Sequence, residues 1–264
     1  MSDHSFVDYS LLDDPYVLAC LFHPRPSYDL TPGKSAHEVL IPMAEGVVIG
    51  GCFHIANPAA VNIVFFHGNG EIVDDYNDLG PLYTQLGINF LAVDYRGYGN
   101  STGSPTTSAM MTDCHAIFRF VTAWLKDHGH SGALIVMGRS LGSASALELV
   151  SHYAEHIAGL IIESGFAYTG PLLQLIGVDL DRLGFRESQG IQNLEKIKTF
   201  TKPTLIIHAE FDHIIPFADG QALYDASPAA DKQLLKIPYA NHNNIFSLAL
   251  GEYLGAVKNL AAKC

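Results

Sequence analysis

The sequence predicts an α/β fold, in which a mostly parallel β-sheet is covered by helices on both faces. Short apolar runs alternate with longer helix-compatible segments along most of the chain. Apolar runs without polar interruptions are typical of parallel strands that are buried on both faces. A Gly-x-Ser-x-Gly pentapeptide also stands between one such run and a helix-compatible stretch. The length of 264 residues suits one large domain of this kind.

The predicted elements begin after an irregular N-terminal arm. Residues 1–36 form this arm, with one short helix near 16–22, and residues 37–264 form the α/β domain. A hairpin is predicted at 39–41 and 47–49, because a turn containing proline and glycine separates two apolar runs. The further strands are predicted at 61–66, 88–93, 133–137, 160–162, 204–208 and 233–237. The helices are predicted at 73–86, 108–128, 141–156, 217–226 and 244–260.

One interval interrupts the alternation of strands and helices. The stretch of about 165–201 lies between two predicted strands and is too long for a plain connection. We therefore expect it to form a small helical cap over the functional site. Its apolar residues either line an acyl-binding pocket or simply pack against the sheet. They are Leu172, Leu173, Leu175 and Ile176.

The composition argues against several classes of function. The net charge of −12 does not suit a nucleic-acid-binding protein, which needs a basic face to meet phosphates. The first residues are acidic and do not resemble a secretory signal, and no apolar run reaches the ~18–20 residues of a transmembrane segment. The four cysteines are scattered without a C-x-x-C pair. We expect a cytoplasmic protein with free thiols and neither a disulfide framework nor a metal site; the sequence does not indicate the oligomeric state.

The candidate nucleophile is Ser140, at the centre of Gly138–Gly142. The apolar run 133–137 leads into this pentapeptide, and a helix-compatible stretch of small residues follows it. A strand, a tight turn and a helix around G-x-S-x-G form a nucleophile elbow, which exposes the serine hydroxyl at the edge of the sheet. The second match, at 99–103, lies in a polar stretch with no strand directly before it. Ser101 is therefore interpreted as a loop residue.

A serine hydroxyl needs a base to take its proton and a third group to orient that base. Asp212 follows the predicted strand at 204–208, and open α/β sheets place their sites at the carboxyl edges of such strands. We predict Asp212 as the acid, with Glu210 and Glu163 as rivals. Capping of the following turn is the alternative role of Asp212.

His242 is predicted as the base. It lies between the last predicted strand and the last predicted helix, in the loop that must carry the base in this topology. His213 is too close to Asp212 in sequence to turn back onto it easily, and His208 is expected inside a strand. Cys114 and His115 are adjacent within a predicted helix and point in different directions, so they do not suit a catalytic dyad.

The acyl-transfer transition state carries a negative oxygen that backbone N–H groups can stabilise. We predict Leu141 N–H as one donor, because it follows the nucleophile directly. The loop after the first long parallel strand reads His67-Gly68-Asn69-Gly70, and we predict the N–H of Asn69 as the second donor. This loop lacks the G-x-x-x-x-G-K-[ST] pattern, so nucleotide binding is not expected.

Together these motifs resemble the α/β-hydrolase superfamily. The resemblance rests on residues 67–70, the Asp94-to-Ser101 stretch, the Ser140 pentapeptide, the end of the Asp212 strand and the His242 loop, and it covers roughly residues 37–260. The chain is similar, more narrowly, to the serine-hydrolase branch with an HGN motif, which includes depalmitoylases, lysophospholipases and many bacterial proteins. The chain departs from relatives at Ala209, where many have glycine, and it lacks the N-terminal cysteine cluster of the depalmitoylases.

The resemblance implies hydrolysis of a small-molecule acyl ester or thioester, with Ser140 as nucleophile, Asp212 and His242 as its partners, and no cofactor. It also implies structural roles for Asp94 and Arg96 near the site. A peptidase or amidase and an acyltransferase would use the same three residues. A non-catalytic ligand-binding protein could keep the same fold. A haloalkane dehalogenase is disfavoured, because it would carry a carboxylate at position 140.

Overall fold

The computed structural model describes residues 7–27 and 36–264. Its centre is an eight-stranded sheet with the order β1-β2-β4-β3-β5-β6-β7-β8. The first two strands pair antiparallel with each other, β2 pairs antiparallel with β4, and every other pairing is parallel. The strands are β1 (Ala36–Pro42), β2 (Val48–His54), β3 (Val61–Phe66), β4 (Ile88–Val93), β5 (Leu134–Arg139), β6 (Gly159–Glu163), β7 (Thr204–Ala209) and β8 (Lys232–Ile237).

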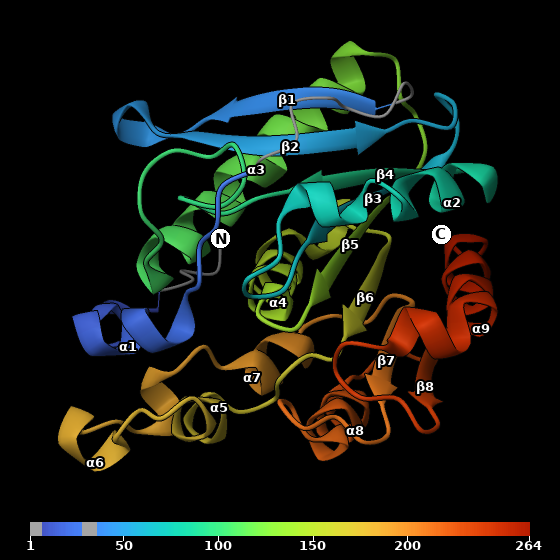
Figure 1. Cartoon of the computed structure of the whole chain (residues 1–264). Coiled ribbons are helices and arrows are strands. Elements are labelled where there is room, and N and C mark those ends of the chain that lie inside the picture. Colours follow the sequence, from blue (N-terminus) through green and yellow to red (C-terminus); the bar gives the residue numbers. More distant parts are fainter. Residues whose placement is uncertain (1–6, 28–35) are drawn as a thin grey trace.

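Helices cover both faces of this sheet, as predicted (Figure 1). Side chains alternate across β3, so that Val64 and Phe66 join one buried cluster and Ile63 and Phe65 join the other. The first cluster lies under α3 (Thr107–Asp127), α4 (Gly142–Tyr153) and α8 (Phe217–Ala226). The second lies under α2 (Leu79–Gln85) and α9 (Ile245–Ala261). None of the helices in the described part of the chain has the length and apolar character that a membrane span requires.

The N-terminal segment packs back onto the α/β domain. The predicted short helix is present as α1 (Pro15–Leu21), after a 3-10 turn at Ser10–Asp13. Leu12 and Val17 have no exposed surface and belong to the cluster that holds α3 and α4. The Tyr16 hydroxyl donates to the carbonyl of Gly177, at 2.6 Å. The described part of the segment therefore shares the core of the sheet and contacts the region between β6 and β7.

The region between β6 and β7 is helical. It contains α5 (Thr169–Leu175), α6 (Leu180–Leu183) and α7 (Asn193–Ile197), and Figure 1 shows α5 and α6 beside α1 at one end of the molecule. The carboxylate of Glu187 accepts hydrogen bonds from the N–H groups of Thr169 and Gly170, at 2.6 and 2.8 Å. These two hydrogen bonds hold the start of α5 against the turn before α7.

The prediction of a single helix at 73–86 is wrong, because the structure has two shorter elements there. A 3-10 turn at Val73–Tyr76 is followed by α2, which begins only at Leu79. Pro81 lacks an N–H and is tolerated only in the first turn of a helix, so the helix starts just before it. A Cβ on Gly80 would lie 2.3 Å from the ring of His54, so this glycine permits close packing of α2 on β2.

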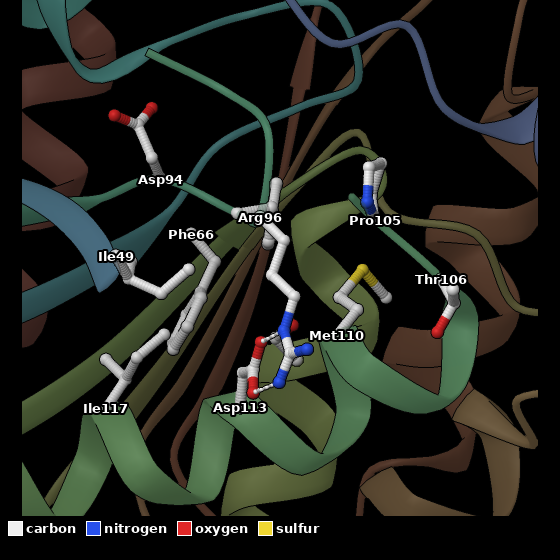
Figure 2. A pocket seen from close by; sticks show the side chains of 11 residues that line it. Ile49, Phe66, Asp94, Arg96, Pro105, Thr106, Met110, Asp113 and Ile117 are labelled. Carbon is white, nitrogen blue, oxygen red and sulfur yellow. Dashed lines mark hydrogen bonds and ion pairs between the residues drawn. The ribbon is translucent and has the colours of Figure 1, made fainter. Parts of the chain in front are cut away.

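A partly buried ion pair fastens α3 to the loop after β4 (Figure 2). The guanidinium of Arg96 donates twice to the carboxylate of Asp113, at 2.6 and 2.9 Å. In Figure 2 the Arg96 side chain reaches down to Asp113, beside the apolar side chains of Phe66 and Ile117. This contact joins the loop after β4 to α3.

Candidate active site

Ser140 stands at the turn between β5 and α4. Its φ angle is +49°, which is strained for a residue with a side chain, and its N–H donates to the Glu163 carbonyl at 2.8 Å. The hydroxyl of Ser143 donates to the Ser140 carbonyl at 2.6 Å and fixes the first turn of α4. These bonds hold the strained backbone between two parallel strands and a helix.

The two glycines of the pentapeptide are required by space. A Cβ on Gly142 would lie 2.1 Å from the carbonyl oxygen of Phe66 and 2.7 Å from that of His67. A Cβ on Gly138 would lie 2.3 Å from the carbonyl oxygen of Gly142. The start of α4 therefore packs directly against the loop that follows β3.

The structure brings Ser140, His242 and Asp212 together from three separate loops. The distance from His242 Nε2 to Ser140 Oγ is 3.1 Å, and that from His242 Nδ1 to Asp212 Oδ2 is 2.7 Å. Because a carboxylate only accepts, Nδ1–H donates to Asp212, which leaves Nε2 to accept from the serine hydroxyl. All three residues are less than 9% exposed.

The carboxylate of Asp212 is stabilised in its charged form. Its Oδ1 accepts from the N–H groups of Ile214 and Ile215, at 3.0 and 2.8 Å. Burial alone would raise the pKa of this carboxyl, but the contact with His242 and these two N–H groups outweigh burial and lower the pKa. The carboxylate thus stays ionised at neutral pH and can orient the imidazole ring.

The rival residues have other partners. Glu210 accepts from the Lys236 ammonium at 3.0 Å, and Glu163 accepts from Arg139 at 3.1 Å and from the Tyr253 hydroxyl at 2.7 Å. His208 lies inside β7 as predicted; its Nε2 donates to the Ile215 carbonyl at 2.8 Å, and burial lowers its pKa. None of these three residues hydrogen-bonds the His242 ring.

The loop 67–70 is held by the N-terminal segment. The side-chain carbonyl of Asn69 accepts from the N–H of His23 at 2.9 Å and from the hydroxyl of Tyr98 at 2.7 Å. Its amide nitrogen lies 2.8 Å from His23 Nδ1. The guanidinium of Arg25 donates to the Gly70 carbonyl at 2.7 Å. These contacts fix the loop that carries Asn69, and sequence reasoning did not predict them.

Sequence reasoning also missed Arg139 and Glu71. The Arg139 guanidinium donates to Glu71 at 2.8 Å, to Glu163 at 3.1 Å and to the carbonyl of His242 at 3.0 Å. Glu71 in turn accepts from the N–H of Gly68 at 2.7 Å. An arginine at a buried position between a strand and a helix was the available signal, because a buried charge requires a partner.

A small apolar cavity lies next to the Asp212 loop. It has a volume of about 110 Å³. Ile214 and Ile215 from the Asp212 loop line it, together with Leu172 and Leu175 from α5. The sequence left open whether the apolar residues of this region line a pocket or pack against the sheet. Leu172 and Leu175 line the cavity, whereas Leu173 is 1% exposed and belongs to the core.

A cluster of potential metal ligands lies elsewhere among the described residues. His115 on α3 and Glu148 and His152 on α4 place one ligand atom each within 4.8 Å of one another. The Glu148 carboxylate, however, already forms an ion pair with the Lys196 ammonium at 2.6 Å. We therefore interpret the cluster as a structural network that joins α3, α4 and α7. Cys114 next to it donates to the Met111 carbonyl within its own helix, which does not suit a dyad with His115.

Comparison of the sequence with known proteins gives a family model and several curated relatives. A family model described as serine aminopeptidase, S33, matches residues 57–178. Over 240 residues the chain is 30% identical to lysophosphatidylserine lipase ABHD12 of Xenopus tropicalis, a match that covers 83% of this chain and 61% of that protein. It is 29% identical over 228 residues to alpha/beta hydrolase domain-containing protein 17C of the same frog, with 81% and 66% covered. The chain thus spans about two thirds or less of the length of these relatives.

Solved structures share the fold. The Pyrococcus furiosus esterase Pf2001 superposes with a TM-score of 0.74 at 20% identity, over 92% of this chain and 98% of that one. Est1E of Butyrivibrio proteoclasticus, solved with ferulic acid, gives 0.73 at 18% identity, over 85% and 98%. The eight-stranded sheet, the family model and these neighbours agree with one another, and the chain has the α/β-hydrolase fold.

Proposed function

We propose that this protein is a serine hydrolase that cleaves a carboxylic ester or thioester through an acyl-enzyme on Ser140. The observation that carries this proposal is the hydrogen-bonded chain from Ser140 through His242 to Asp212, at 3.1 and 2.7 Å. A serine with a base and an oriented acid in line is the arrangement that acyl transfer needs.

In the proposed reaction, Ser140 Oγ attacks the acyl carbon while His242 Nε2 takes its proton. The imidazolium then gives this proton to the leaving alcohol or thiol, and the acyl group stays on the serine. Water deprotonated by His242 attacks the acyl-enzyme and releases the acid together with the regenerated hydroxyl. Asp212 keeps the ring oriented and stabilises its positive charge.

The N–H groups of Leu141 and Asn69 are our proposed donors to the tetrahedral oxygen. Leu141 directly precedes α4, so the helix N-terminus faces the same place. The close contact of Gly142 with the carbonyls of Phe66 and His67 supports this assignment, because it brings the two loops together.

The mostly apolar cavity beside the Asp212 loop, whose lining also includes Asp219, supports a substrate with an apolar acyl group. Its lining of leucine and isoleucine side chains suits a short alkyl or aryl group. One relative is named as a lipase, which supports an ester substrate. An amidase, a peptidase or an acyltransferase would use the same three residues and remain alternatives for the test below. Membership of the HGN-bearing branch stays a prediction.

The first test is hydrolysis of p-nitrophenyl esters of increasing acyl length. We expect turnover by the unaltered protein, a preference for short acyl chains because the cavity is small, and loss of at least ~10³-fold in kcat in Ser140→Ala. Ser145→Ala is the matched control, because Ser145 is buried on the same helix and lies one turn beyond the elbow. We expect this variant to keep kcat within about twofold.

Labelling by a fluorophosphonate separates the outcomes. Labelling of Ser140 without ester turnover would support Ser140 as the nucleophile. The substrate would then be an amide or another acyl donor and not an ester. Absence of both labelling and turnover in folded protein would contradict the proposal and favour a ligand-binding role.

A further inference from the structure

Three parts of the candidate site meet at one buried arginine. Arg139 ends β5 directly before Ser140, and its side chain is 7% exposed. Its Nε, Nη1 and Nη2 atoms each serve a different acceptor: Glu71, Glu163 and the carbonyl of His242. The acceptors come from the loop after β3, the end of β6 and the loop before α9.

The link continues from Glu71 to the loop 67–70. Its Oε1 accepts from Arg139, whereas its Oε2 accepts from the Gly68 N–H at 2.7 Å and from the Tyr76 hydroxyl at 2.6 Å. Burial opposes the charge of Glu71, but Arg139 and these donors outweigh burial and lower its pKa. Gly68 is adjacent to Asn69, so the Glu71 carboxylate helps to position the proposed donor, together with the contacts that His23, Tyr98 and Arg25 make with this loop.

We propose that Glu71 and Arg139 are positioning residues. They hold the loop 67–70 and the His242 loop in their places relative to Ser140. This proposal rests on the serine-hydrolase function proposed above. Neither residue is a reacting group: Glu71 acts through the Gly68 backbone, and Arg139 acts through the His242 backbone.

The chemistry of the two side chains explains why similar residues at these positions should not make the same contacts. Arg139 and the Gly68 N–H bond different oxygens of Glu71, so in Glu71→Gln one of these two donors would face the NH₂ group instead of an oxygen. A lysine at 139 keeps the positive charge, but its ammonium is a point charge and lacks the planar fork that reaches three acceptors on three elements.

The molecule contains a matched control, a second partly buried arginine–carboxylate pair. Arg96 and Asp113 form such a pair with two short hydrogen bonds, and Asp113 lies on α3 (Figure 2). The two bonds join the loop after β4 to α3, and neither involves the loop 67–70, the pentapeptide or the His242 loop. Asp113→Asn should therefore lower Tm as the other variants do, without moving the site.

The experiment measures kcat, KM, the rate constant of fluorophosphonate labelling and Tm for Glu71→Gln, Arg139→Lys, their double variant and Asp113→Asn. We expect kcat and the labelling rate constant to fall about 10- to 100-fold in both single variants, with KM within about threefold, because displacement of the site by less than 1 Å acts on the transition state. The double variant should be close to the worse single variant, since both break one chain of contacts. Asp113→Asn should keep kcat within about twofold.

Unchanged kcat in both single variants would overturn the proposal. The proposal would also be overturned if the losses in kcat and in the labelling rate constant only matched the loss of folded protein. The same holds if both variants fail to fold while Asp113→Asn folds, because the network would then contribute only to stability. Failure of the proposed function is a different result: the unaltered protein would then show neither ester turnover nor Ser140-dependent labelling.

Discussion

At the scale of single residues, the backbone at the pentapeptide leaves no room for side chains at its glycines. The Cβ of an alanine at 142 would meet the Phe66 carbonyl at 2.1 Å, and this carbonyl belongs to the neighbouring parallel strand. Such a contact cannot be relieved by rotating a side chain. The strained φ of Ser140 adds to the same requirement.

We therefore predict opposite effects for two glycine-to-alanine exchanges. Gly142→Ala should destabilise the protein by about 2–4 kcal/mol and abolish ester turnover, because the elbow must shift. Gly255→Ala, on α9 with nothing within 4 Å of its added Cβ, should stabilise the protein by about 0.5–1 kcal/mol. Urea unfolding of both variants measures the difference, and equal stabilities would refute the steric argument.

At the scale of elements, α4 is joined to α7 by a buried ion pair. The Lys196 ammonium lies 2.6 Å from the Glu148 carboxylate, and both side chains are less than 10% exposed. Burial alone would raise the pKa of Glu148, but His115 and Lys196 outweigh burial and lower the pKa to about 2. A lowered pKa means that the stabilisation is fully present above the ordinary value near 4.5 and is lost as the pH falls towards 2.

Lys196→Met tests this pair. We expect the loss of about 3–5 kcal/mol at pH 7, since it leaves a buried carboxylate without its cation. The pKa of Glu148 should rise in this variant, so its deficit in stability against the unaltered protein should shrink as the pH falls and Glu148 is protonated. Lys198→Met is the control: Lys198 pairs with Glu195 on the surface, with both side chains at least half exposed. Its effect should stay within about 0.5 kcal/mol. Urea unfolding followed by circular dichroism from pH 7 to pH 3 measures both variants, and a deficit of Lys196→Met that is small at pH 7 or does not change with pH would argue against the ion pair.

At the scale of the whole molecule, the N-terminal segment completes both the core and the site. Its leucine and valine side chains pack under α3 and α4, and His23 and Arg25 hold the loop that carries Asn69. Because one segment performs both tasks, stability and activity should depend on it together.

Leu12→Ala tests the packing of this segment. Leu12 has no exposed surface, so the exchange should cost about 2–5 kcal/mol. Leu40→Ala on β1 is the matched control, since Leu40 is 64% exposed and its loss should cost less than about 0.5 kcal/mol. Thermal unfolding distinguishes the two, and similar values would mean that the segment does not share the core.

The sequence by itself determined the α/β fold and most element positions, because apolar runs and glycine-closed helices are local patterns. It also predicted the three residues that the structure joins by hydrogen bonds, since their order and their loops follow from the topology. The division of the helix at 73–86 was missed, although Pro81 signalled it. Only the tertiary structure decided the contacts of Arg139 with Glu71 and of Asn69 with His23. These partners lie 68 and 46 residues apart, and such pairs depend on strand order and loop packing, which no local pattern encodes.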